Sequence, residues 1–144
     1  MSHKQISRTV EKKLKRARVA RLATVDAVGH PHVVPICFVY DGLVFYTAVD
    51  RKSKRVKAER LTRVRNIMAT GQVALLVDEY FEAWERLWYV LVRGRAQRVE
   101  GAVEQQRAIR ILQKKYRQYA KGMLGEDALV IRIVPERITS WGRV

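Results

Sequence analysis

A regular alternation of short β-type segments with tight turns constrains the fold of this chain more than any other feature. Residues Arg21–Val25 place alternate side chains on opposite faces, and the polar turn Asp26–Gly29 follows them. The next segment, His32–Tyr40, is almost wholly apolar, and Asp41-Gly42 separates it from Leu43–Thr47. Asp-Gly between two such segments is a strong hairpin signal, because both residues tolerate the positive φ of a type I′ turn. We therefore expect a strand, a turn and a β-hairpin in succession.

Pro35 lies near the middle of the second segment. Because proline has no backbone N–H, the strand must be bulged there or left unpaired on that side. Either arrangement would leave backbone groups free to meet a ligand.

A cationic run follows the hairpin, with the sequence Arg51-Lys52-Ser53-Lys54-Arg55. Asp50 is a candidate N-cap, and apolar residues recur at mostly helical spacings through Met68, which predicts a helix beginning in this run. The free N–H groups and the dipole of a helix start favour an anion. The sequence therefore predicts a phosphate site at Lys52, Ser53 and Lys54, whereas the cations from Arg60 onward are interpreted as a solvated helix face.

Apolar periodicity outlines the rest of the chain. Helical spacing relates Val10, Leu14 and Ala17, and again Gln106, Ile109, Leu112, Tyr116 and Tyr119. Further strands are expected at 72–77, 87–97, 129–134 and 138–141, with Gly71 in a helix-to-strand turn and Gly94 at a strand irregularity. These elements predict a mainly β fold with α, an antiparallel barrel with peripheral helices, formed by one domain over residues 1–144.

Length and composition agree with one small domain. The chain has 144 residues, of which 48% are hydrophobic, enough for a core but with limited burial for a small protein, so we expect it to dimerise. It has neither an apolar stretch of membrane-spanning length nor an apolar signal core near Met1, so neither membrane insertion nor export is expected. The single Cys37 excludes an internal disulfide and suits the cytoplasm.

The charge balance raises a different function. Twenty-nine Lys and Arg against fourteen Asp and Glu give a net charge of +15, which is typical of nucleic-acid-binding proteins. The cations are spread over several elements, however, and the sequence contains no helix-turn-helix, zinc-finger or RNP-type pattern. Nucleic acid remains an alternative partner.

Neither a metal site nor a hydrolytic site is predicted. His30 and His32 have the His-x-His spacing of some metal ligands, but no further Cys, His or carboxylate cluster completes a ligand set. A Gly-x-Ser-x-Gly motif is absent. No catalytic residue is assigned.

The order and spacing of four segments resemble the split-barrel flavin and deazaflavin oxidoreductases, the superfamily of pyridoxamine 5′-phosphate oxidase, and most of all the branch that uses the deazaflavin coenzyme F-420. The similarity spans about Val19 to Trp141, and no single segment is diagnostic. The segments are Arg18-Val19-Ala20-Arg21-Leu22-Ala23-Thr24, Pro31-His32-Val33-Val34-Pro35, Thr47-Ala48-Val49-Asp50-Arg51-Lys52-Ser53-Lys54 and Leu87-Trp88-Tyr89-Val90.

The resemblance implies a six- to seven-stranded antiparallel split β-barrel that forms a homodimer, with cofactor contacts shared between the subunits. It places Thr47 and Ala48 near the polar edge of the cofactor ring and the ribityl chain, and Lys52, Ser53 and Lys54 at the phosphate. The strand beside the ring would contribute His32, Val33, Val34, Pro35 and Ile36.

The acidic, aromatic segment Asp78–Tyr89 has two interpretations. Tyr80, Trp84 and Trp88 could form a wall beside the coenzyme ring, or the segment could be a plain loop from which Trp88 enters the core. Both interpretations stay open at the level of sequence.

The resemblance also implies an oxidoreductase that transfers hydride between its cofactor and a small organic substrate. F-420 is favoured over FMN, since the excess of cations suits its anionic tail. The segment Glu136–Gly142 lacks the Arg-Leu-x-Asp-Arg pattern of true pyridoxamine phosphate oxidases, so that activity is not expected. The alternatives are a nucleic-acid-binding module and a non-catalytic cofactor-binding protein.

Overall fold

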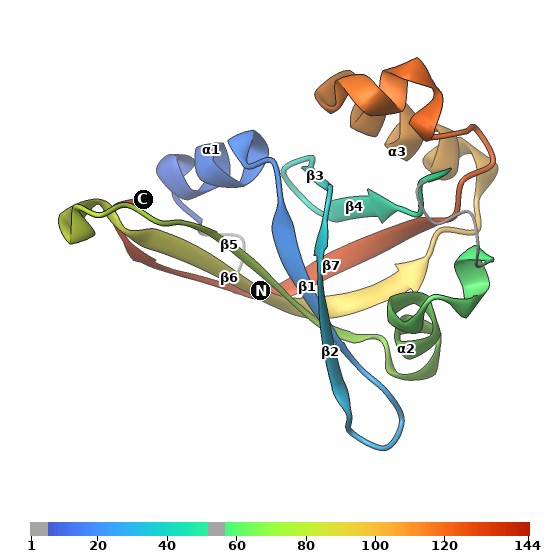
Figure 1. Cartoon of the computed structure of the whole chain (residues 1–144), viewed down its shortest axis with the longest axis horizontal. Coiled ribbons are helices and arrows are strands. Elements are labelled where there is room, and N and C mark those ends of the chain that lie inside the picture. Colours follow the sequence, from blue (N-terminus) through green and yellow to red (C-terminus); the bar gives the residue numbers. More distant parts are fainter. Residues whose placement is uncertain (1–5, 52–56) are drawn as a thin grey trace.

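Seven antiparallel strands form one sheet in the computed structural model, which describes residues 6–51 and 57–144 (Figure 1). The order of strands across the sheet is β2-β1-β5-β6-β7-β4-β3. The strands are β1 (Ala20–Val25), β2 (Pro31–Ile36), β3 (Val39–Tyr40), β4 (Phe45–Ala48), β5 (Gln72–Glu79), β6 (Trp88–Arg98) and β7 (Val130–Gly142). The helical elements are α1 (Arg8–Arg16), η3 (Ala58–Arg60), α2 (Thr62–Thr70), η4 (Trp84–Arg86), α3 (Ala102–Lys115) and η5 (Tyr119–Met123).

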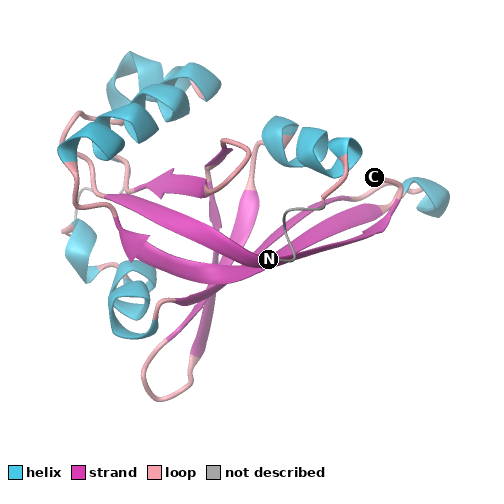
Figure 2. Ribbon diagram, turned by 180° about the vertical axis from the view of Figure 1, so that it is seen from behind, coloured by secondary structure: helices cyan, strands magenta, loops and turns pink. Residues whose placement is uncertain are grey.

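The sheet is curled into an open barrel. Strands β2 and β3 are consecutive in the chain but occupy opposite edges of the sheet, and only two residues, Cys37 and Phe38, connect them. Since three peptide steps span at most about 11 Å, the two edges must approach each other. The helices lie around the curled sheet (Figure 2), as expected for a split β-barrel with peripheral helices.

The expected single strand from His32 to Tyr40 is therefore wrong, because the chain changes edges at Cys37-Phe38. The ladder runs without a bulge through the pair of Pro35 and Arg21. Strand β2 is an edge strand, so its second side has no neighbour in the sheet. Of the two arrangements expected for Pro35, the structure adopts the unpaired edge, which is where a sheet tolerates proline.

The hairpin between β3 and β4 is confirmed, but its turn is not type I′. Among the described residues only glycines have positive φ, so Asp41 cannot take the first position of such a turn. The loop instead contains four residues, 41–44, between the paired Tyr40 and Phe45. The carboxylate of Asp41 accepts hydrogen bonds from the N–H groups of Leu43 and Val44, each at 2.9 Å, and this Asx-type capping replaces the shorter turn.

The helix predicted from near Asp50 through Met68 is not one continuous helix. Helix α2 begins at Thr62, and the backbone is extended at Lys57 and again at Leu61, on either side of the short η3. Ala58 and Leu61 pack against the core from this irregular segment, so tertiary contacts override the helical spacing. Residues 52–56, which include most of the cationic run, lie outside the described residues.

Two hydrophobic clusters support the sheet. Helices α1 and α2 pack on one cluster, to which they contribute Val10, Leu14, Val64 and Ile67. Helix α3 packs on the other through Ala108, Ile109 and Leu112. These contacts confirm the helical stripes predicted at Val10 and Leu14 and at Ile109 and Leu112.

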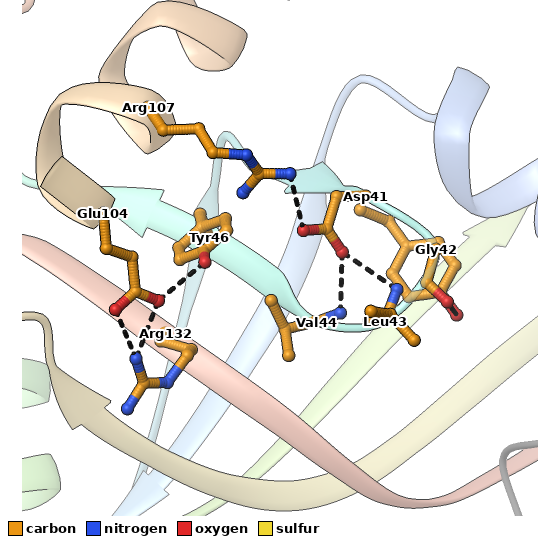
Figure 3. A network of polar contacts seen from close by, with 9 residues as sticks. Asp41, Gly42, Leu43, Val44, Tyr46, Glu104, Arg107 and Arg132 are labelled. Atoms are coloured by element: carbon orange, nitrogen blue, oxygen red, sulfur yellow. Dashed lines mark hydrogen bonds and ion pairs between the residues drawn. The ribbon is translucent and has the colours of Figure 1, made fainter.

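Polar contacts fix α3 against the β3–β4 hairpin and β7 (Figure 3). Glu104 accepts a hydrogen bond from the buried Tyr46 hydroxyl at 2.7 Å and is paired with Arg132 at 2.6 Å. Arg107 pairs with Asp41 at 3.2 Å. The Arg132 and Tyr46 hydrogen bonds lower the pKa of Glu104, so its carboxylate stays charged and keeps α3 attached to β4 and β7.

Two glycines have the roles expected from sequence. Gly71 ends α2 in the left-handed conformation with φ of 69°. Gly94 lies at a register shift between β6 and β7, where a Cβ atom would overlap the Val134 carbonyl oxygen. The shift lets one continuous strand, β7, replace the two shorter strands expected at 129–134 and 138–141.

Within the described residues, every helix is too short or too polar to cross a membrane.

Candidate functional site

A cavity of about 280 Å³ lies where the edge strand β2, strand β4, helix α2 and the turn η5 meet. Its lining residues are Val34, Pro35, Ile36, Cys37, Thr47, Ala48, Asp50, Arg63 and Tyr119. The curl of the sheet creates this meeting point, because it brings β2 and the β3–β4 hairpin together from opposite edges.

The cavity unites two of the segments singled out from the sequence. Val34, Pro35 and Ile36 line one wall, and Thr47 and Ala48 line another. Because β2 is an edge strand, its outer backbone groups are not used by a neighbouring strand of the described sheet. This wall can offer apolar contact together with backbone hydrogen bonds, as expected for a strand beside a flat ring.

Thr47 stabilises the wall. Its side chain is 4% exposed, and its hydroxyl donates a hydrogen bond of 2.7 Å to the carbonyl oxygen of Cys37. The bond ties the crossover between β2 and β3 to strand β4. Thr47 therefore positions the cavity wall, in addition to lining it.

Tyr119 adds a polar group to the cavity lining. The Tyr119 hydroxyl donates a hydrogen bond of 2.8 Å to a carboxylate oxygen of Asp50, although Tyr119 itself is only 4% exposed. Burial, followed by the hydrogen bond to Asp50, raises the pKa of Tyr119 far above its ordinary value. Tyr119 therefore stays protonated at physiological pH and acts as a hydrogen-bond donor.

Arg63 brings a positive charge to the same place. Burial lowers the pKa of its guanidinium, while the nearby Asp50 and Tyr119 oxygens act in the opposite direction. The guanidinium group nevertheless remains charged, because the ordinary pKa of arginine is so high. It supplies a planar set of N–H donors in partly dehydrated surroundings.

The structure separates other predicted site residues from this cavity. His32, Val33 and Trp88 are absent from its lining. Val33 is 62% exposed on the opposite face of β2 from Val34. Lys52, Ser53 and Lys54 lie outside the described residues.

Trp88 enters the core. It is 5% exposed, and its indole N–H donates to Glu79 at 3.1 Å. Tyr80 and Trp84, from the same acidic segment, are exposed. Within one subunit, Trp88 therefore belongs to the core, as the second interpretation of this segment expected. It also lines a different cavity, beside α1.

Sequence reasoning assigned different roles to three residues that line the cavity. Arg63 was expected in a solvated face, Asp50 as a helix N-cap, and Tyr119 in an apolar helical stripe. The predicted burial of Tyr119 is confirmed. Its predicted place in the helix is wrong, because α3 ends at Lys115 and Tyr119 lies in η5 after it. One feature of the sequence could have pointed to Tyr119: a buried tyrosine hydroxyl needs a hydrogen-bond partner.

Metal binding has no structural support in the described ranges. No three His, Cys, Asp or Glu side chains there form a group that could hold an ion. His30 instead contacts Asp26 at 3.0 Å in the turn between β1 and β2.

The arrangement suits a flat, conjugated ligand with an electronegative edge. The lining combines aliphatic residues of β2 and β4 with a polar wall that includes Arg63 and Tyr119. Among the described lining residues, the Tyr119 hydroxyl is bonded to the Asp50 carboxylate.

The open barrel, with a cavity between its edge strand and β4, defines a split-barrel protein. A family-level sequence comparison matches residues 6–142 to pyridoxamine 5′-phosphate oxidase. The chain belongs to this family of FMN-binding split barrels, which includes flavin- and F-420-dependent oxidoreductases as well as haem-binding proteins. A comparison with curated proteins gave no significant match.

Solved structures share the fold at low sequence identity. The haem storage protein HutZ from Vibrio cholerae is 18% identical, with 93% of this chain and 92% of that chain covered at a TM-score of 0.70. An F420 reductase is 23% identical, with 93% and 98% covered at a TM-score of 0.67. An FAD-binding protein from Mesorhizobium loti is 23% identical, with 94% of both chains covered at a TM-score of 0.68.

Proposed function

We propose that the protein is an oxidoreductase that binds the deazaflavin coenzyme F-420, or FMN as the second choice, in the β2–β4 cavity. The cofactor would exchange hydride with a small organic substrate. One observation carries the proposal: Val34–Ile36 and Thr47-Ala48, far apart in the sheet order, meet at one cavity together with Arg63.

The residues present fit a flavin-type group. The edge strand offers backbone groups and aliphatic surface to the ring, and the Arg63 guanidinium suits an electronegative ring edge or an anionic side arm. The cofactor supplies the hydride chemistry, and the chain binds it, orients it and shields it from water. Tyr119, held protonated, contributes a hydroxyl to the polar wall but is a weak acid in this setting.

The size of the cavity favours a second subunit. About 280 Å³ in one chain is just below the roughly 300–1,000 Å³ of typical ligand pockets, and a flavin with its phosphate arm needs more contact than this wall provides. A homodimer would complete the site. This proposal agrees with the expectation that cofactor contacts are shared between subunits.

F-420 is preferred over FMN for an electrostatic reason. The net charge of +15 creates a field that attracts multiply charged anions, and the deazaflavin carries a longer anionic tail than FMN. The same charge favours nucleic acid as an alternative partner, and a non-catalytic cofactor carrier is the other alternative.

Absorbance titration of the purified protein with F-420 and with FMN tests the proposal, with sedimentation velocity measuring the oligomeric state. We expect saturable binding at micromolar concentration or tighter, to a dimer. For coenzyme that stays bound through purification, slow reoxidation of the reduced complex by air would indicate F-420, and rapid reoxidation would indicate FMN. Failure to bind either coenzyme, together with tight and salt-sensitive binding of DNA or RNA, would overturn the proposal. Binding without turnover of any acceptor would indicate a carrier.

A further inference from the structure

A second cavity, of about 450 Å³, lies between α1 and the strands β5 and β6. None of its lining residues lines the β2–β4 cavity. Within one chain the two linings are separate, so the chemistry of the second cavity can be considered by itself.

Cations from α1 and from the residues after it line this cavity: Lys12, Lys13, Arg16 and Arg18. Over residues 6–51 and 57–144, no carboxylate forms an ion pair with any of them. Glu11, the acidic residue of α1, is paired with Lys15 at 2.9 Å and does not neutralise them.

Two acidic side chains, Asp78 and Glu79, also line the cavity. Asp78 is paired with Arg21 at 2.9 Å, whereas Glu79 accepts a hydrogen bond from the Trp88 indole, which is uncharged and leaves the charge of Glu79 in place. Four cations against this one unneutralised side chain leave the cavity positive. A concave surface with an excess of one sign of charge concentrates counter-ions.

The cationic wall is anchored to the core. Lys13 places its Nζ 4.8 Å from the centroid of the buried Trp88 ring, a cation–π contact that holds the ammonium group at the cavity. The helix dipole explains why cations are favoured in the last turn of α1. It does not explain why they border a cavity in which the acidic side chains are outnumbered.

We infer that this cavity binds a small, multiply charged anion, a di- or tricarboxylate or a phosphate compound, through Lys12, Lys13 and Arg16. A bound anion would relieve the mutual repulsion of these cations. The inference does not rest on the proposed cofactor, because the two cavities share no lining residue.

Trp88 provides the reporter for the test. The chain has three tryptophans, so the variant Trp84→Phe with Trp141→Phe retains Trp88 alone. Both replaced side chains are exposed, so the fold should survive. Citrate and pyrophosphate are titrated at constant ionic strength against the Trp88 emission. We expect a saturable change with at least one of them, and the tighter of the two identifies carboxylate or phosphate as the preferred group.

A matched pair of charge variants locates the site. In the Trp88-only background, Lys12→Gln with Arg16→Gln removes two cations from the cavity. Lys114→Gln with Arg117→Gln removes two exposed cations near the end of α3. We expect the first pair to weaken binding about tenfold and the second less than twofold.

Three results would overturn the inference: no saturable change with either probe, equal loss in the two variant pairs, or no loss in either. Equal loss that disappears with added salt would indicate the diffuse field that nucleic acid would also sense. Cofactor titration of the same variants separates the two proposals. The Lys12 and Arg16 substitutions should reduce F-420 or FMN affinity no more than the control substitutions at Lys114 and Arg117 do.

Discussion

The Lys115 ammonium group donates a hydrogen bond of 2.9 Å to the carbonyl oxygen of Phe38 and lies 4.1 Å from the centroid of the Phe38 ring. The Tyr116 hydroxyl accepts a hydrogen bond of 3.0 Å from the Phe38 N–H group. The end of α3 thus holds the two-residue crossover between β2 and β3 in place. Since Cys37 lines the cofactor cavity, this contact also positions the candidate site.

Stability should depend on the protonation of Lys115. Burial, and then the nearby Arg18, lowers its pKa from 10.5 to about 8. Between these values the unfolded chain binds more protons than the native protein, so the contribution of this group to stability rises with pH and is complete above 10.5. The unfolding free energy of the wild type, minus that of Lys115→Met, should increase by about 1 kcal/mol from pH 7.5 to 9.5, after allowance for solvent screening.

Urea unfolding at several pH values measures this difference, and subtraction cancels the titration of groups common to both proteins. A difference that stays constant or falls with rising pH would show that the Lys115 ammonium form is not destabilised in the native state.

Gly94 should tolerate no side chain. In Gly94→Ala the new Cβ would overlap the Val134 carbonyl oxygen in β7, and backbone cannot move aside as a flexible side chain can. We expect a loss of about 2–3 kcal/mol in unfolding free energy. Gly101→Ala is the control, because Gly101 has negative φ and no atom within 4 Å of the added Cβ. Similar urea midpoints for the two variants would contradict the close approach of the Val134 carbonyl oxygen to Gly94.

Arg63 should contribute to cofactor affinity, whereas Arg65 should not. Both lie on α2, but Arg63 is partly buried at the cavity and Arg65 is exposed. Replacing Arg63 with Gln removes a charge-assisted hydrogen bond and should weaken F-420 or FMN binding about tenfold or more. Arg65→Gln should change it less than twofold. Absorbance titration measures both, and equal losses would mean that Arg63 acts only through the general field.

The double variant Lys52→Ala with Lys54→Ala should weaken cofactor binding by about two orders of magnitude if these residues hold the phosphate. This expectation rests on the family resemblance, because Lys52 and Lys54 lie outside the described residues. Alanine at Lys114 and Arg117 removes the same charge elsewhere, and its smaller effect should be screened by salt. If both double variants lose affinity equally and recover it at high salt, the cationic run is a solvated surface.

Sequence by itself determined the local elements of this protein. Alternation of side chains identified β1 and β5, helical spacing identified the buried stripes of α1 and α3, and Asp41-Gly42 marked the hairpin. These features depend on residues close together in the chain, whose periodicity matches that of a strand or helix. The family resemblance predicted the split barrel. It also predicted five cofactor-site residues that line one cavity in the structure: Val34, Pro35, Ile36, Thr47 and Ala48.

Only the tertiary structure decided where the strand after His32 is interrupted, where α2 begins and which polar side chains meet at the cavity. The interruption at Cys37-Phe38 follows from the curl of the sheet, which brings the edge strands β2 and β3 close together. The start of α2 at Thr62 follows from the packing of Ala58 and Leu61 against the core. Tyr119 reaches Asp50 across 69 positions of sequence. Such contacts depend on how the whole sheet curves, and periodicity within a short segment contains no information about that curvature.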